Sequence, residues 1–272
     1  MAFTYIASLY RTIINSEHSI LEEHMHSLKL LAILLFCLAQ ANVVLSESVS
    51  MSFGEKIPPF CFPETNSGLE LDVIGEALAF KGHTLVPSYY PFARIPIAFK
   101  QKYVNATMTD LGEDLTAYGG HYGNPAVWYD NVFITLKEKK LTIKKPEDLK
   151  GLSVISFQGA IKRYPKWLAS VKTAGNYYEL DDQKLQVLTL NMGRYDVVLS
   201  DRNIYKYYSL QFKKTRKFAP KAITEHQFIE LDLNNYRPIF RDPSIRDDFN
   251  LGLKHLKDSG RYQEIYDHYL KE

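Results

Sequence analysis

Two stretches of sequence decide the fold: PEDLKGLSVISFQGA at residues 146–160 and YDVVLSD at residues 195–201. Each contains a short apolar run that predicts a buried strand, and each run leads directly into polar residues. Gln158 and Gly159 follow the first run, and Asp201 follows the second. Because ligands of open α/β sheets gather at the carboxyl ends of strands, we expect one half of a small-molecule site here.

The rest of the chain alternates β-like runs with helical patterns, which predicts an α/β fold with two mainly parallel sheets covered by helices. We expect strands at 49–53, 84–89, 104–109, 131–136 and 227–233, helices at about 68–82, from 91, at 244–259 and at 260–270, and a further α/β unit over 146–219. Residues 110–128 show little periodicity and are rich in Gly, Asn and Tyr, so they predict a long loop suited to lining a site.

The last two predicted helices, 244–259 and 260–270, each carry an apolar face that must pack against another element. The first α/β unit is their natural partner, which makes that unit discontinuous in sequence. We therefore predict residues 42–134 and 225–272 as lobe 1, and residues 135–224 as an inserted lobe 2.

An apolar run near the N-terminus indicates export. Residues 25–29 form a short positive leader, residues 30–38 (LLAILLFCL) are apolar, and residues 39–41 have the A-x-A form that signal peptidase cleaves after. The apolar run is much shorter than the roughly 20 residues of a membrane-spanning helix. We predict a cleaved signal peptide at residues 25–41 and a periplasmic location.

Residues 1–24 are unusual for a secretory leader, whose charged start is normally short. We interpret them as an upstream extension, with translation starting at Met25; a genuine long leader or an additional amphipathic helix is the alternative. Acylation at Cys37 would indicate a lipoprotein, but Leu35 and Phe36 are larger than the residues such a site accepts.

Charge and cysteine content exclude several classes of function. Residues 42–272 contain 31 basic and 28 acidic residues, a balance of +3 that is too small for a nucleic-acid reader. Their only cysteine is Cys61, so neither an intrachain disulfide nor a Cys-based zinc site is possible. The histidines lack metal-ligand spacing, and we expect no metal and no cofactor.

A series of short motifs occurs in one order along the chain: IPPF at 57–60, GLELD at 68–72, EDLKG at 147–151, QG at 158–159, GRYD at 193–196, SD at 200–201 and LKDSGRY at 256–262. In this order they resemble the extracellular solute-binding proteins of family 3, which serve ABC importers, mostly for polar amino acids. The resemblance covers nearly all of residues 42–272. It implies a two-lobed type II periplasmic-binding fold with two hinge strands and a ligand enclosed between the lobes. YPFAR at 90–94 is similar to a subgroup that includes free-standing receptors.

The resemblance carries over the site residues unevenly. Asp201 matches the family carboxylate that holds the ligand's α-ammonium group, and an acceptor-only carboxylate suits that role. The family's hydroxyl residue after Gln-Gly is Ala160 here, and the family's carboxylate-binding arginine is missing from residues 109–114. The resemblance thus implies that the amine end of the site is kept and the acid end is lost.

Arg94 is the candidate to replace the missing arginine, because a guanidinium binds carboxylate through two parallel hydrogen bonds. The competing interpretation is that Arg94 pairs with Asp110 or Glu113 and braces the loop. Tyr129 matches the family's hinge-side tyrosine, and aromatic side chains here would stack on flat or cationic guests or simply form core. The full set of expected ligand-binding residues is Phe60, Phe92, Arg94, Thr109, Asp110, Tyr129, Gln158, Gly159 and Asp201, with Trp128 as a further ring.

Two groups of residues receive a plain structural interpretation. Cys61 has no base or oxyanion device beside it in sequence, so we expect a packed thiol rather than a nucleophile. Lys162, Arg163 and Lys166 belong to basic runs that are typical of a solvated face, with docking of an anionic partner as the alternative.

We predict a monomeric solute-binding protein with no catalytic residues, which captures a small polar, amine-bearing ligand for the permease of an ABC importer. One alternative is a ligand-sensing partner of a membrane sensor. Another is a periplasmic enzyme of the cyclohexadienyl dehydratase type, which would need a general acid from Glu55, Asp110 or Glu113.

Overall fold

The structure is a computed structural model that describes residues 29, 46–55, 57–216, 218–230 and 236–271. The predicted upstream extension, start at Met25, signal peptide and Cys37 lie outside this part of the chain, apart from Lys29. Among the described residues, no helix combines the length and the apolar character that crossing a bilayer requires.

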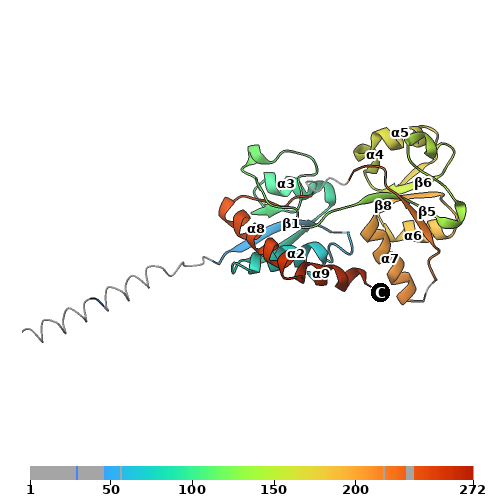
Figure 1. The fold of residues 1–272 in the computed structure, drawn as a ribbon. Coiled ribbons are helices and arrows are strands. Elements are labelled where there is room, and N and C mark those ends of the chain that lie inside the picture. Colours follow the sequence, from blue (N-terminus) through green and yellow to red (C-terminus); the bar gives the residue numbers. More distant parts are fainter. Residues whose placement is uncertain (1–28, 30–45, 56, 217, 231–235, 272) are drawn as a thin grey trace, which may run out of the picture. The chain divides into compact units, whose positions relative to one another are not determined.

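The first sheet combines strands from both ends of the described chain. They are β1 (Ser48–Gly54), β2 (Thr84–Tyr90), β3 (Ala106–Thr107), β4 (His121–Tyr122) and β10 (Ile239–Phe240). The order is β2-β1-β3-β10-β4, and β1 is labelled in Figure 1. β1 is parallel to β2 and β3, whereas β10 is antiparallel to β3 and β4. β4 lies within the stretch predicted as a loop.

Helices from both ends of the chain pack on this sheet. They are η1 (Phe92–Arg94), α2 (Leu69–Ala79), α3 (Ile95–Lys100), η2 (Thr116–Tyr118), α8 (Pro243–Asp258) and α9 (Arg261–Leu270). The apolar faces of α8 and α9 share one core with α2 and β1, as predicted. Gly252 lets α8 approach α2 closely, because a Cβ there would lie 1.9 Å from the carbonyl oxygen of Ala77.

The second sheet is formed by β5 (Asn131–Leu136), β6 (Val154–Phe157), β7 (Tyr177–Leu180), β8 (Val197–Asp201) and β9 (Ile223–His226), in the order β7-β6-β8-β5-β9. β6 is parallel to β7 and β8, and β5 is antiparallel to β8 and β9. Its helices are η3 (Lys137–Lys139), η4 (Pro146–Leu149), α4 (Ala160–Arg163), α5 (Pro165–Thr173), α6 (Lys184–Asn191) and α7 (Arg202–Lys214). Separate apolar cores lie on its two faces.

The predicted α/β class with two helix-flanked sheets is confirmed, although each sheet is mixed rather than mainly parallel. Residues 227–230 do not form the strand expected at 227–233, and residues 231–233 of that prediction lie outside the described residues. The strand at this point is β9, which ends at His226, because it is residues 223–226 that pair with β5. The sheets divide between β4 and β5 and between β9 and β10, while the lobe boundaries given above remain a prediction.

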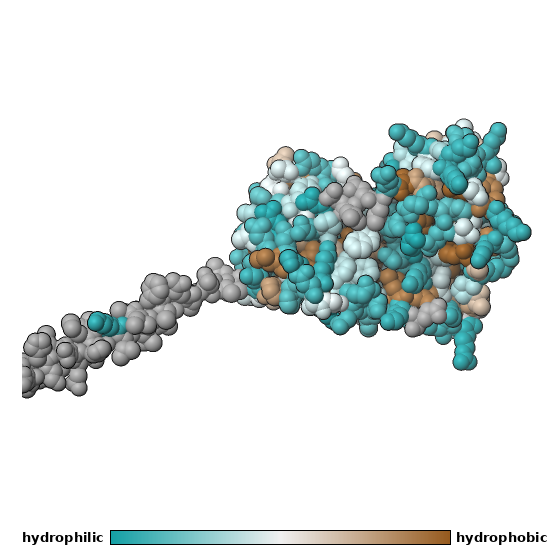
Figure 2. Space-filling view, viewed as in Figure 1, coloured by the Kyte–Doolittle hydropathy of each residue, from teal (hydrophilic) through white to brown (hydrophobic). Residues whose placement is uncertain are grey.

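The visible face of the molecule is largely hydrophilic, with apolar residues in small separate patches (Figure 2). The large apolar side chains lie mainly inside, where Phe53, Phe99, Phe133 and Phe249 are fully buried. Burial of aromatic and aliphatic side chains is thus the main source of stability in a chain whose described cysteine, Cys61, is unpaired.

Candidate ligand-binding site

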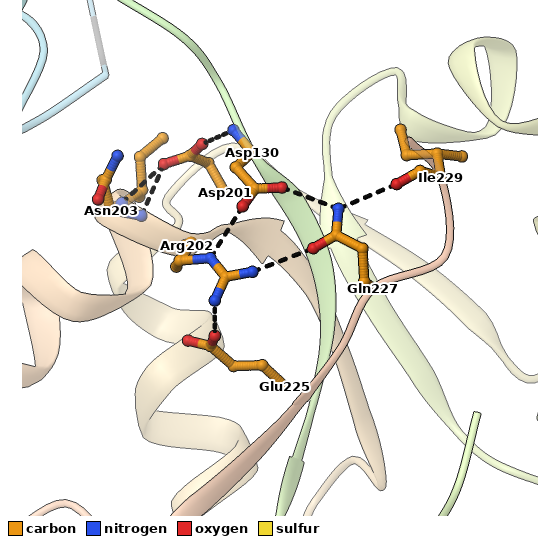
Figure 3. A network of polar contacts seen from close by, with 8 residues as sticks. Asp130, Asp201, Arg202, Asn203, Glu225, Gln227 and Ile229 are labelled. Carbon is orange, nitrogen blue, oxygen red and sulfur yellow. Dashed lines mark hydrogen bonds and ion pairs between the residues drawn. The ribbon is translucent and has the colours of Figure 1, made fainter. Parts of the chain in front are cut away.

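Asp201 ends β8 and caps the N-terminus of α7 (Figure 3). Its Oδ1 accepts hydrogen bonds from the backbone N–H groups of Asn203 and Ile204, at 2.8 and 3.0 Å. Its Oδ2 accepts one from the N–H of Asp130, at 2.6 Å. The residue is only 2% exposed. Burial raises the pKa of Asp201 to about 7, against the lowering effect of these hydrogen bonds.

The loop after β6 holds a carboxylate of the protein itself. Gly159 has a φ of 88°, and its N–H donates to Oε2 of Glu179 at 2.9 Å. The N–H of Ile161 and the hydroxyl of Tyr177 donate to Oε1 of the same side chain, at 3.0 and 2.7 Å. The amide expected to face a ligand therefore already binds Glu179, while Gln158 is exposed.

These contacts keep Glu179 charged. Burial by itself would raise the pKa of Glu179, but the hydrogen bonds from Gly159, Ile161 and Tyr177 hold it below its ordinary value. An external carboxylate at this loop would have to displace a carboxylate that is covalently part of β7. Displacement of this kind is unfavourable because the internal group loses little further freedom on binding.

Residues after β3 form a closed set of contacts that leaves out Arg94. Asp110 accepts from the N–H of Gly112 at 2.8 Å and from the hydroxyl of Tyr122 at 2.8 Å. Thr109 is buried, and its hydroxyl accepts from the N–H of Leu111. Glu113 pairs with Lys100 at 2.6 Å.

Arg94 is exposed, and among the described residues its guanidinium makes no ion pair. The expected alternative partners, Asp110 and Glu113, are bound to Tyr122 and Lys100 instead. The guanidinium of Arg94 is therefore free to contact a ligand, but no contact with the other expected site residues holds it in place.

A series of contacting rings contains Phe60, Tyr129 and Phe92, which the sequence analysis identified, and Tyr236, which it did not. Phe60 stacks on Tyr129 with ring centroids 4.1 Å apart, and Tyr129 lies 4.3 Å from the ring of Tyr236. Phe92 is 6.4 Å from Tyr236. The guanidinium of Arg163, from α4, lies 4.5 Å from the centre of the Tyr236 ring on the second sheet's side. We call these five side chains the ring stack.

The ring stack corrects the expectation for Arg163. Its position in a basic run predicted a solvated side chain, but it is half-buried and contacts the rings of Tyr164 and Tyr236. Phe60 is fully buried and Tyr236 is 7% exposed. Trp128 lies outside the stack, 6.1 Å from both Tyr262 and Tyr266.

A buried carboxyl group lies beside the ring stack. Glu70, near the start of α2, is 1% exposed, and the hydroxyl of Tyr129 donates to its Oε2 at 3.3 Å. Burial raises the pKa of Glu70 to about 8, and the bond from Tyr129 lowers it only in part. Glu70 is thus largely uncharged at neutral pH.

Polar residues join the segments that connect the sheets (Figure 3). Arg202 donates to Asp130 at 2.9 Å, to Gln227 at 3.0 Å and to Glu225. Gln227 in turn donates to Asp130 at 3.0 Å. A shallow hollow of about 540 Å³ beside these residues is lined by Asp130, Gln227, Phe228, Ile229 and Glu230.

The described residues contain no group of three His, Cys, Asp or Glu side chains that could hold a metal ion. Cys61 is fully buried, and burial raises the pKa of its thiol far above the ordinary value. A thiol in this state is a poor nucleophile, which agrees with the packing role expected from the sequence.

The structure thus brings Phe60, Tyr129 and Phe92 together with Tyr236 and Arg163. Asp201 and Gly159 lie at strand ends of the second sheet, as predicted, but both are bonded within the protein. Sequence reasoning did not assign four residues to the site: Tyr236, Arg163, Glu70 and Glu179. No local pattern identifies Tyr236 or Glu179. Arg163 could have been considered, because it follows Gly159 at the predicted strand end by only four residues.

The chain forms two mixed sheets flanked by helices, and it crosses between them twice. Among solved structures this chain is similar to an ancestral arginine-binding protein bound to glutamine, with 20% identity and a TM-score of 0.59 over 83% of this chain and 98% of that one. Neither protein-family models nor curated proteins give a match.

A periplasmic binding protein of an arginine transport system from Legionella pneumophila is 19% identical, with a TM-score of 0.57 over 82% of this chain and all of that one. A histidine kinase sensor domain with similarity to periplasmic binding proteins is 18% identical, with a TM-score of 0.60 over 82% of this chain and 96% of that one. These neighbours establish the fold and confirm, at that level, the resemblance to solute-binding proteins of family 3.

Proposed function

We propose that the chain is a solute-binding protein that works outside the cytoplasmic membrane and captures a small polar, amine-bearing ligand, such as an amino acid, for the permease of an ABC importer. It acts as a monomer and without catalytic residues. Residues 25–41 are its cleaved signal peptide, residues 42–134 and 225–272 form lobe 1, and residues 135–224 form lobe 2. The ligand binds between the lobes and stabilises their closed arrangement.

One observation carries this proposal. The fold extends over 82–84% of this chain and over 98–100% of three chains described as binding proteins for arginine or amino acids, so the whole binding unit has a counterpart here. Ligands of such α/β sheets contact the carboxyl ends of strands, where Asp201 and Gly159 lie.

Asp201 remains the candidate for the ligand's amine. A carboxylate offers about four lone-pair directions, and three of those of Asp201 are used by N–H groups. The remaining direction suits one ammonium hydrogen. Phe60, Tyr129 and Phe92 supply aromatic surface, and Arg94, Thr109, Asp110 and Gln158 complete the proposed set.

A thermal-shift screen of the purified chain tests the proposal, with the common amino acids, polyamines and short peptides as probes. A ligand present at about 100 times its Kd should stabilise the fold by about 2.7 kcal/mol and raise Tm clearly. If no probe in the panel raises Tm, the proposal is wrong.

A role in sensing is the second candidate, because one structural neighbour is a histidine kinase sensor domain. Loss of an importer's binding protein should abolish uptake of the labelled ligand. Loss of a sensor's partner should leave uptake intact and abolish the response to the ligand.

The enzyme alternative is less favoured by the geometry. Two of its three candidate acids, Asp110 and Glu113, are bonded to Tyr122 and Lys100. Mass spectrometry of the ligand after incubation with the chain would detect any turnover.

A further inference from the structure

The ring of Tyr236 occupies a slot built from three other side chains. The ring centre of Tyr129 lies 4.3 Å from it with the two ring planes tilted by 46°, the guanidinium of Arg163 lies 4.5 Å from it, and Phe92 is 6.4 Å away. We call the space bounded by these three residues the ring slot. Separations of this size are typical of contacts between rings and of a cation over a ring, so the slot holds one aromatic ring.

The backbone of Tyr236 is not in its most favourable conformation. Its φ is 60°, in the left-handed region that residues other than glycine seldom adopt. The Tyr236 ring is nevertheless only 7% exposed, and it packs against the ring of Tyr129 and the guanidinium of Arg163. The contacts in the slot therefore offset some backbone strain, which indicates a space with a strong preference for an aromatic group.

Arg163 brings a positive charge to the slot that no carboxylate neutralises. Its guanidinium lies over the rings of Tyr164 and Tyr236 and hydrogen-bonds the Tyr164 hydroxyl, and within the described residues it forms no ion pair. A guanidinium stacks through its flat face and donates hydrogen bonds from its edge, so it can hold a ring and an acid group of one molecule together. Arg163 is half-buried, which strengthens both interactions relative to an exposed arginine.

The same charge disfavours cationic side chains. A lysine, arginine or polyamine guest would place its cation in a slot whose one wall is already a guanidinium, and like charges at this distance repel. Glu179 and Asp201 are bound to backbone N–H groups and do not pair with Arg163. The chemistry of the slot therefore differs from what an arginine-binding site requires.

We propose that the ligand carries an aromatic ring and a carboxylate, that its ring takes the place of Tyr236 between Tyr129 and Arg163, and that Arg163 binds its carboxylate. Arg163 then supplies, from the second sheet's side, the acid clamp that residues 109–114 lack. Tyr236 is the internal occupant of the slot, with which the ligand competes. This inference rests on the proposed function and narrows its ligand class.

Three ring compounds that differ by one group test the proposal with the full chain: L-tyrosine, 4-hydroxyphenylpropionate, which lacks the amine, and tyramine, which lacks the carboxylate. L-Arginine is the aliphatic comparison. We expect L-tyrosine and 4-hydroxyphenylpropionate to raise Tm and to bind measurably by calorimetry. Tyramine should bind about ten-fold or more weakly than L-tyrosine, since it offers no partner to the guanidinium.

Variants separate the residues involved. Arg163→Gln should lower the affinity for both acids about ten-fold more than the affinity for tyramine, which loses only the contact between its ring and the guanidinium. Lys162→Gln, which changes the exposed neighbour of Arg163, should behave as the wild type. Tyr236→Ala should bind L-tyrosine more tightly than the wild type, because the internal competitor is gone. Tyr236→Phe, which keeps the ring, should not.

The outcomes are distinguishable. If L-arginine or another aliphatic amino acid binds and the ring compounds do not, the inference is overturned and the proposed function stands. Equal affinity for tyramine and L-tyrosine overturns it as well, and so does loss of acid preference in Arg94→Gln rather than in Arg163→Gln. If no amino acid or ring compound binds, the proposed function also fails.

Discussion

Glu179, at the carboxyl edge of the second sheet, accepts three hydrogen bonds, whereas Glu70, beside the ring stack, has one long bond from Tyr129 within the described chain. The first stays charged and the second is held neutral, since Glu70 is almost fully buried with one donor, whereas Glu179 is half-buried with three. Burial and the supply of N–H and O–H donors together set the charge state. The polar groups at the strand ends are therefore already hydrogen-bonded within the protein, whereas Glu70, beside the ring stack, has few hydrogen-bond donors around it.

Asp201→Ala should have the largest effect on stability. It removes the acceptor of two N–H groups at the start of α7 and of the N–H of Asp130, so we expect a loss of about 3 kcal/mol in the free energy of unfolding. Urea denaturation measures this. Asp242→Ala is the matched control, because Asp242 caps α8 without a second segment attached, and it should cost about 1 kcal/mol. Equal losses would mean that the Asp130 bond contributes nothing.

Glu70→Gln should change how stability depends on pH. The pKa of Glu70 is about 8 in the folded chain and near 4.5 when unfolded, so unfolding releases a proton between these values. The folded state therefore loses stability as pH rises through this window. The glutamine variant lacks this contribution and should gain stability relative to wild type from about pH 5 to about pH 9. Parallel pH curves would contradict the burial of an unmatched acid.

Glu179→Gln should show the opposite sign and a smaller effect. The pKa of Glu179 is lowered in the folded chain, so its contribution is present above its ordinary pKa and is lost as pH falls through the folded value. Near neutral pH we expect the variant to lose about 1 kcal/mol, and at acid pH to match the wild type. Denaturation curves at both pH values test this, and a constant difference would show that charge plays no part.

Arg202→Ala should have the smallest effect. Its side chain is 39% exposed, and its contacts with Asp130 and Glu225 are open to solvent and salt. We expect a loss of at most about 1 kcal/mol, which decreases further as salt is added. A larger loss that does not change with salt would show that the Arg202 contacts stabilise the fold as the buried hydrogen bonds of Asp201 do.

The sequence pattern by itself located the helices and strands whose apolar residues recur with a regular period. β5 occupies the predicted residues, and α8 and α9 begin and end within a residue or so of the prediction. β4 and β10 were missed because each has two residues and exists only through pairing with strands distant in sequence. β9 was placed too late for the same reason, since pairing with β5 fixes its limits.

For the site, the sequence by itself determined which residues end the strands: Asp201 after a buried run, and Gly159 at a turn that needs a positive φ. It also determined that the arginine expected after β3 is absent. These features are local, because apolar runs and glycine preferences act over a few residues.

Only the tertiary structure decided what those strand ends contact. Glu179 reaches Gly159 across neighbouring strands, and Tyr236 meets Tyr129 and Arg163 from more than seventy residues away along the chain. Contacts of this kind depend on how sheets and crossing segments pack, which no local pattern specifies. The residues at the carboxyl ends of the strands could therefore be predicted from the sequence. That these residues bind other groups of the protein could not.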